Sequence, residues 1–153
     1  MSWRSLLSCH QGRLLLFGKW TEAKTLWALV ADGSDKLSGS NSRNTLQARG
    51  QLAQAMRYLN EPSESRALFE DVLQRQKSHL DKNDETSLIT RQNFANLLRG
   101  CLHDFAAARE LEEQVVAGFT KLHGPEHDRT LTARGNYALT LDMEGRYNDA
   151  KRE

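Results

Sequence analysis

Two histidines near the end of the sequence have the spacing of zinc ligands. His123 and His127 stand four residues apart with Glu126 between them. Such a pair binds zinc when a continuous helix places both imidazoles on one face. Gly124 and Pro125 separate the histidines here, and this dipeptide cannot continue a helix. The segment is better explained as a turn, so we expect neither a metal nor any other cofactor.

Other residue types that carry out catalysis are present without the spacing that catalysis needs. The sequence has no Gly-rich phosphate loop, no Cys-x-x-Cys pair and no supported Ser, His and Asp arrangement. Carboxylates are scattered, as in Glu110, Glu112 and Glu113, which is typical of a solvated helix face. No group of residues converges on a nucleophile or a base. The sequence predicts a protein that is not an enzyme.

Charge and composition exclude other functions. The 153 residues contain 21 Lys and Arg against 20 Asp and Glu, a net charge of +1. This balance predicts neither nucleic-acid binding nor attraction to a membrane surface. No apolar run approaches the roughly 18 residues that span a bilayer. Cys9 and Cys101 are far apart in sequence, and we expect them to be reduced in a cytoplasmic protein.

The stretch 86–122 predicts two helices joined by a turn. Apolar side chains recur on one stripe of each helix. The stripe of the first helix is Leu88, Ala95 and Leu98, and that of the second is Ala108, Leu111 and Val115. Gly100 to Asp104 supplies the break, with Asp104 as the N-cap of the second helix.

Both stripes return along the chain in steps of 42 and 43 residues. The first recurs as Leu46, Ala53 and Met56 and as Leu131, Ala138 and Leu141. The second recurs as Ala23, Leu26 and Val30 and as Ser65, Leu68 and Val72. This periodicity predicts an all-α repeat array in which each unit packs on its neighbours.

The array divides into four units. We expect an atypical first repeat at 1–37, a second at 44–80, a third at 86–122 and an incomplete fourth at 130–153. Within the first, helices are predicted at 1–18 and 20–36. Within the fourth, a helix at 130–143 is followed by a turn at Gly145 and a further helix from Tyr147. The stripe of this last helix would be cut short, so we expect an open apolar edge and a fragment of a longer array.

Helix boundaries are also predicted by capping and turn residues. Asn44 or Thr45 is expected to cap the helix that runs to about Leu59. Pro62 suits the first turn of the next helix, where its missing N–H breaks no hydrogen bond.

The repeat unit resembles the tetratricopeptide repeat. The segment Asn136-Tyr137-Ala138 followed by Gly145-Arg146-Tyr147-Asn148-Asp149-Ala150 carries the likeness best, and Ala23 with Trp27 and Ser65 with Phe69 resemble the Ala-x-x-x-Phe element of that family. The period of 42 and the linker 122–131 are similar to the longer repeats of kinesin light chain. Asn60 and Leu102 stand where the family has the turn glycine. The resemblance implies a right-handed α-solenoid.

The same resemblance implies a peptide-binding groove along the first helix of each repeat. The position two before the conserved Ala, which often faces the peptide, holds Gln51, Asn93 and Asn136. Helical spacing from these three adds Gln47, Gln54, Arg57, Gln92, Asn96, Arg99, Thr132, Leu139 and Asp142. An amide offers a donor and an acceptor to an extended backbone. The alternative is that these are solvated residues without a ligand.

Arg57 and Arg99 lie one period apart, so we expect them to be neighbours on the groove wall. Two guanidinium groups there would bind an acidic peptide side chain or a terminal carboxylate. The alternative is that they form surface ion pairs with Glu61, Asp104 or Asp142, which contribute little to stability.

Two functions fit these expectations. The first is a scaffold that binds a protein or peptide partner, acidic in character, in the concave groove. The second is a structural spacer or sensor arm of a larger signalling protein, with end-to-end self-association through its open ends. The first predicts sensitivity at groove residues such as Asn93, and the second predicts it at the end faces.

Overall fold

The computed structural model describes residues 3–81 and 83–150, with side chains for 18–81 and 83–148. The described residues form helices and connecting turns without strands. The α-helices are α1 (Trp3–Ser38), α2 (Arg43–Tyr58), α3 (Pro62–His79), α4 (Glu85–Leu97), α5 (Phe105–His123) and α6 (Asp128–Ala150). A π-helical turn, Leu98–Leu102, continues α4. None of the described helices is long and apolar enough to cross a membrane.

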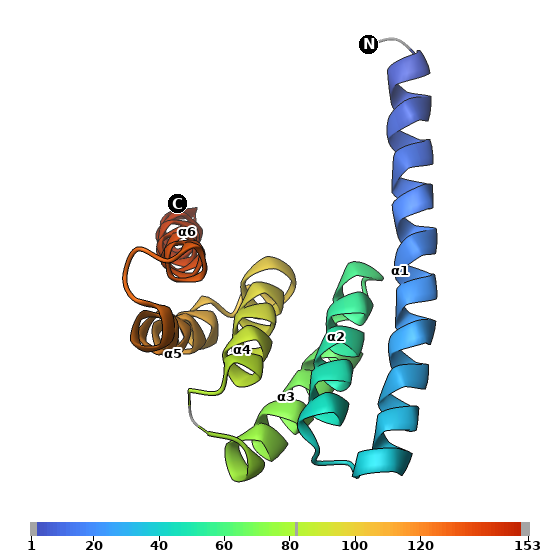
Figure 1. The fold of residues 1–153 in the computed structure, drawn as a ribbon. Helices are drawn as coiled ribbons and strands as arrows, with labels where there is room; N and C mark the ends of the chain where they lie inside the picture. Colours follow the sequence, from blue (N-terminus) through green and yellow to red (C-terminus); the bar gives the residue numbers. More distant parts are fainter. Residues whose placement is uncertain (1–2, 82, 151–153) are drawn as a thin grey trace.

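The helices follow one another as an open array rather than around a common centre (Figure 1). Helices α2, α4 and α6 lie along one side of the array, and α3 and α5 lie on the other. Helix α1 stands at one end and α6 at the other. The predicted all-α solenoid of helix pairs is confirmed.

Side-chain caps begin the central helices. The Asp104 carboxylate accepts a hydrogen bond from the Ala107 N–H, which confirms the predicted cap of α5. Pro62 is at the start of α3, as expected. The cap predicted for α2 is wrong, because Ser42 holds that position and its Oγ accepts from the Thr45 N–H at 3.2 Å.

Two turns between helices use a left-handed backbone at a residue other than glycine. Asn60 has φ 61° and His103 has φ 54°. The first confirms the turn expected at Asn60, whereas the second lies one residue beyond the expected Leu102. The π-helical turn accounts for the shift, because its wider winding carries the helix through Leu102 before the chain reverses.

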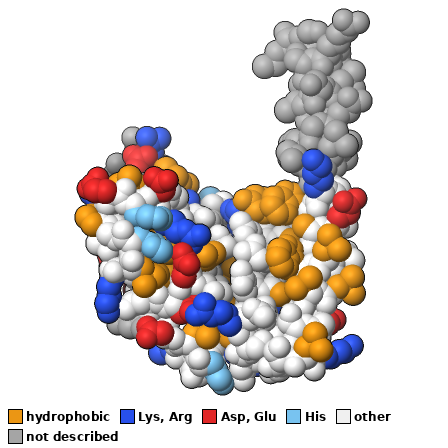
Figure 2. Space-filling model, in the orientation of Figure 1, with side chains coloured by type: hydrophobic (Ala, Val, Ile, Leu, Met, Phe, Trp, Pro, Cys, Tyr) orange, Lys and Arg blue, Asp and Glu red, His pale blue; other side chains and the backbone are white. Residues whose placement is uncertain are grey.

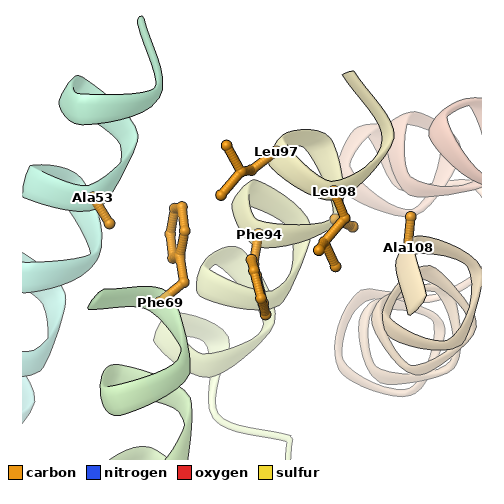
Figure 3. Packing of buried hydrophobic residues seen from close by; sticks show 7 residues of the cluster. Ala53, Phe69, Phe94, Leu97, Leu98 and Ala108 are labelled. Carbon is orange, nitrogen blue, oxygen red and sulfur yellow. The ribbon is translucent and has the colours of Figure 1, made fainter. Parts of the chain in front are cut away.

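The largest buried cluster joins α2, α3, α4 and α5 (Figure 3). Phe69 and Phe94 lie side by side with ring centroids 5.4 Å apart. Ala53 lies on one side of this aromatic pair and Ala108 beyond the other, so the small side chains let neighbouring helices approach. The cluster therefore spans two predicted repeats, as stacking of repeats requires.

A second cluster joins α4, α5 and α6 through Leu88, Val115, Phe119 and Ala133. Gly118 is needed here, because a Cβ at this position would lie 2.5 Å from Leu88 Cδ2. The stripes predicted for the two helices of the third repeat therefore face one another inside the array, with Ala133 of α6 packed beside them.

The two predicted end turns are wrong. Helix α1 is continuous from Trp3 to Ser38, without the break expected between residues 18 and 20. Helix α6 is continuous through Gly145, where a turn was expected. A glycine inside a helix weakens it by about 1 kcal/mol without ending it, and no positive φ occurs at Gly18 or Gly145.

Candidate functional site

The three predicted amide positions occupy equivalent places on α2, α4 and α6. Gln51, Asn93 and Asn136 are all half-buried. Asn93 Nδ2 donates a hydrogen bond to Gln54 Oε1 at 3.2 Å, which links α4 to α2. The amides of neighbouring helices are thus held against one another.

Between α2 and α4 the surface is hollowed only slightly. A cavity of about 30 Å³ is lined by Gln47, Gly50, Gln51, Thr86, Ile89, Thr90 and Asn93. A space of this size matches a single water molecule. A large side chain therefore does not fit between these two helices.

Arg99 is buried, with 9% of its surface exposed. Its Nη1 lies 2.9 Å from Glu112 Oε1 on α5 and donates to Asn136 O and Thr140 Oγ1 on α6. Its Nη2 donates to Asn96 Oδ1 at 2.7 Å. The guanidinium connects the end of the α4 segment to α5 and α6. It therefore does not face a ligand, as it would have to if Arg57 and Arg99 together bound an acidic group.

The alternative for the arginines is also wrong in its partners. Glu61 forms an ion pair with Lys24 at 2.6 Å, and Asp142 forms one with Arg146 at 3.0 Å. Asp104 caps α5. None of the three carboxylates expected to pair with Arg57 or Arg99 does so.

Arg57 lies instead in an aromatic stack between α1 and α2. Its guanidinium carbon is 4.3 Å from the centre of the Tyr58 ring. Tyr58 stacks on Trp20 with ring centroids 4.0 Å apart. Arg57 Nε is buried and has no hydrogen-bond partner among the described residues. A cation with an unused donor therefore lies at the end of the amide row.

The remaining predicted groove residues differ in exposure. Gln92 and Asn96 on α4 are half-buried, whereas Thr132 and Asp142 on α6 and Gln47 on α2 are exposed. Leu139 on α6 is 46% exposed. The exposed groove positions predicted on α6 thus include both polar and apolar side chains.

Glu112 is the residue that sequence reasoning missed. It was placed on a solvated face, yet it is 2% exposed. Burial raises the pKa of Glu112, an effect that Thr140 and the charge of Arg99 oppose. Its Oε2 has no hydrogen-bond partner among the described residues. The repeat register could have found it, because Ala108 and Glu112 match Ser65 and Phe69 of the Ala-x-x-x-Phe element.

A larger hollow lies on the other side of the array. This cavity, of about 650 Å³, opens between α3 and α5 over Phe94 of α4, and its wall includes Gln76 and Arg91. Burial lowers the pKa of Arg91. Gln76 Nε2 donates to Thr90 Oγ1 at 3.1 Å. None of the predicted groove residues lines this cavity.

The two histidines with zinc-like spacing contact each other. The rings of His123 and His127 stack with centroids 4.4 Å apart, and His123 Nε2 lies 3.1 Å from Glu85 Oε1. Among the residues that the structure describes, no three His, Cys, Asp or Glu side chains gather around a metal position. Cys101 is exposed and free. Cys9 lies outside the described side chains.

Two family models of the tetratricopeptide repeat match the sequence, one over residues 85–152 and one over residues 45–85. The chain is a tetratricopeptide repeat protein. The structure of this repeat array is similar to a crystal structure of nearly identical TPR-like repeats from a protein described as a kinesin light chain of Podosopora anserina. The TM-score is 0.77 at 25% identity, over 95% of this chain and 70% of that chain.

A second crystal structure of those repeats, which carries a substitution, gives a TM-score of 0.76 at 25% identity. It covers 95% of this chain and 69% of the other. No curated protein matches the sequence. The predicted likeness to kinesin-light-chain repeats is confirmed. Tetratricopeptide repeats generally mediate contacts between proteins. Membership of the family supports this general function without naming a partner.

Proposed function

We propose that this tetratricopeptide repeat protein is a non-catalytic scaffold that holds an extended segment of a partner protein along α2, α4 and α6. The observation that carries the proposal is the half-buried amide at one register of all three helices, at Gln51, Asn93 and Asn136. A row of amides can bond successive peptide groups of an extended chain, whatever its side chains.

The bond between Asn93 and Gln54 supports this role. It uses one N–H of Asn93 and the carbonyl oxygen of Gln54, and leaves the Asn93 carbonyl and the Gln54 amino group for a ligand. Because the two side chains already hold each other, a partner would not have to immobilise both. The pair thus offers an acceptor and a donor between adjacent helices.

We also propose that the partner is acidic where it passes Arg57. Arg57 forms no ion pair among the described residues, and its guanidinium plane is fixed over Tyr58, which leaves its charge for a carboxylate. Arg99 does not contribute, because Glu112 neutralises it within the array. The proposal further places the protein in the cytoplasm and, from its net charge of +1, away from nucleic acid and membrane surfaces.

The test begins with peptides selected from a random dodecapeptide display library on the intact chain. Fluorescence anisotropy then compares the original chain with an Asn93→Ala and Asn136→Ala double variant and with Gln114→Ala, an exposed amide on α5 that serves as the control. We expect the double variant to lose tenfold or more in affinity, about 1.4 kcal/mol, and the control to lose none. Equal binding by all three proteins would refute the groove.

The acidic preference has a separate test. Arg57→Gln should weaken binding of an acidic selected peptide several-fold while it leaves the isosteric amide form of that peptide unaffected. A similar loss for both peptides would show that Arg57 acts through the Tyr58 stack rather than through charge.

A second candidate function is favoured by a different observation. Large apolar side chains are exposed at both ends of the array, including Leu26 at 62% on α1 and Leu141 at 42% on α6. These faces suit a spacer or sensor arm of a larger signalling protein, in which the array associates through its ends.

A further inference from the structure

The face of α1 that matches the second helix of a repeat is open. In α3 and α5 the corresponding stripe is buried inside the repeat, with Val72 at 0% and Val115 at 1% exposure. In α1 the same position holds Val30, which is 47% exposed, and the neighbouring Leu26 is 62% exposed. Figure 2 shows hydrophobic side chains gathered over the described part of α1. In the central repeats this face of the second helix packs against the first helix of its own repeat. On α1 no such helix covers it in the described part of the chain.

The face of α6 that matches the first helix of a repeat is open in the complementary way. Leu46 on α2 and Leu88 on α4 are 0% and 1% exposed. The equivalent Leu131 on α6 is 45% exposed, and Leu141, one period after the buried Leu98, is 42% exposed. In the central repeats this face of the first helix packs against the second helix of its own repeat. Among the described residues, no such helix covers it on α6.

Small residues mark where the two helices of a repeat cross. In the second repeat the Ser65 hydroxyl donates to Ala53 O at 2.7 Å, and in the third repeat Ala95 and Ala108 are both fully buried. Such residues let two helix backbones approach closely. The open faces carry alanines at the same positions, Ala138 on α6 and Ala23 on α1.

From these equivalences we infer that α6 of one copy packs antiparallel against α1 of a second copy and completes a tetratricopeptide repeat between the two chains. The inference rests on the second candidate function and names its partner. The contact is the internal first-helix to second-helix interface, continued from one molecule to the next. Because α1 and α6 are different surfaces, the interface is heterologous and allows growth by addition of further copies.

The continuous course of α1 and α6, where the sequence predicts a turn in each, supports the same pairing. Helix α6 runs past Gly145, and α1 begins well before Trp20. In an antiparallel pair these two extensions lie beside each other, so no turn obstructs the contact. With a net charge of +1, successive copies repel one another only weakly.

The test is sedimentation velocity on the full chain over a range of concentrations. We expect the weight-average mass to rise with concentration through a series of oligomers. Leu26→Glu on α1 and Leu141→Glu on α6 should each give a monomer, since either change removes one half of every contact. Both side chains are exposed, so circular dichroism should show helix content like that of the original chain.

Mixing the two monomeric variants gives the decisive result. The Leu26→Glu chain keeps an intact α6 face and the Leu141→Glu chain keeps an intact α1 face, so an equimolar mixture should form a dimer and nothing larger. Leu37→Glu on α1 and Leu139→Glu on α6 are the matched controls, because both leucines are also exposed. The repeat equivalent of Leu37 is Leu122, which is 44% exposed, and those of Leu139 are Gln54 and Asn96, which belong to the predicted groove set. Both controls should oligomerise like the original chain.

Three results would overturn the inference: a monomeric original chain, a single-face variant that still dimerises, or a mixture without a dimer. A monomeric original chain would mean that other helices or a different partner cover the open faces of α1 and α6. A single-face variant that still dimerises would indicate a symmetric contact. Peptide anisotropy on the Leu26→Glu monomer keeps the two proposals separate. Its groove is unaltered, so peptide binding should match that of the original chain whether or not the chains associate.

Discussion

Replacing Arg99 with Met should leave a carboxylate buried without its cation. Glu112 is 2% exposed, and Arg99 Nη1 lies 2.9 Å from its Oε1. At an effective dielectric constant of about 20, the attraction at this distance is about 6 kcal/mol before the cost of burying Arg99 is subtracted. Breaking a buried pair from one side costs about 3–5 kcal/mol in measured cases. We expect Arg99→Met to lower the free energy of unfolding by about 3–5 kcal/mol at neutral pH.

The double variant Arg99→Met with Glu112→Phe separates the charge from the packing. The position of Glu112 is equivalent to that of Phe69, which is fully buried. Replacing a buried ion pair with apolar residues of similar volume is often neutral, so the double variant should return to within about 1 kcal/mol of the original chain. Arg146→Met is the control, because the Arg146 side chain is 80% exposed and its pair with Asp142 should contribute less than about 1 kcal/mol.

The pH dependence gives a second readout. Burial raises the pKa of Glu112 above its usual 4.5. The folded chain therefore favours the protonated carboxyl, and this contribution to stability is fully present below the unfolded pKa and is lost as pH rises through the folded pKa. Arg99→Met should raise the folded pKa further. Part of its loss should therefore be recovered when the pH is lowered from neutral to mildly acidic.

Urea unfolding followed by circular dichroism measures these free energies, and hydrogen exchange of α6 amides shows whether that helix undocks first. A repeat array can unfold in parts, so both measurements are needed. A loss below about 1 kcal/mol for Arg99→Met, with no pH dependence, would show that Glu112 reaches solvent and that the pair does not hold α6.

Further predictions concern packing and capping, each measured by urea unfolding. Gly118→Ala should destabilise by about 1–3 kcal/mol, because its Cβ would collide with buried Leu88, whereas Gly135→Ala, in open space on α6, should stabilise by up to about 1 kcal/mol; equal effects would refute the close contact. Leu88→Ala and Leu98→Ala should each cost about 2–5 kcal/mol, and a loss a tenth as large would contradict the register. Asp104→Ala should cost about 1 kcal/mol through loss of the α5 cap, and hydrogen exchange at the start of α5 should increase.

The central repeats could be predicted from the sequence because each stripe there has a partner. Leu46, Ala53, Leu88 and Ala95 are all nearly or fully buried, as their spacing indicates. The end turns could not be predicted in the same way. A turn between two helices is stabilised when the second helix packs back on the first, and the stripe at Leu26 is exposed. A glycine alone does not impose that reversal.

The candidate site was predicted less completely than the fold, for a related reason. Periodicity assigns a residue to a face, and the three acidic residues Glu110, Glu112 and Glu113 together indicate a solvated one. The position within the repeat carries the stronger information, because the slot of Glu112 holds Phe69 in the preceding repeat. A carboxylate in an aromatic slot requires a cation from a facing helix. Arg99, in the π-helical turn that follows α4, meets that requirement and stabilises the array. Of the two arginines, only Arg57 therefore remains for the contact with an acidic segment that we propose.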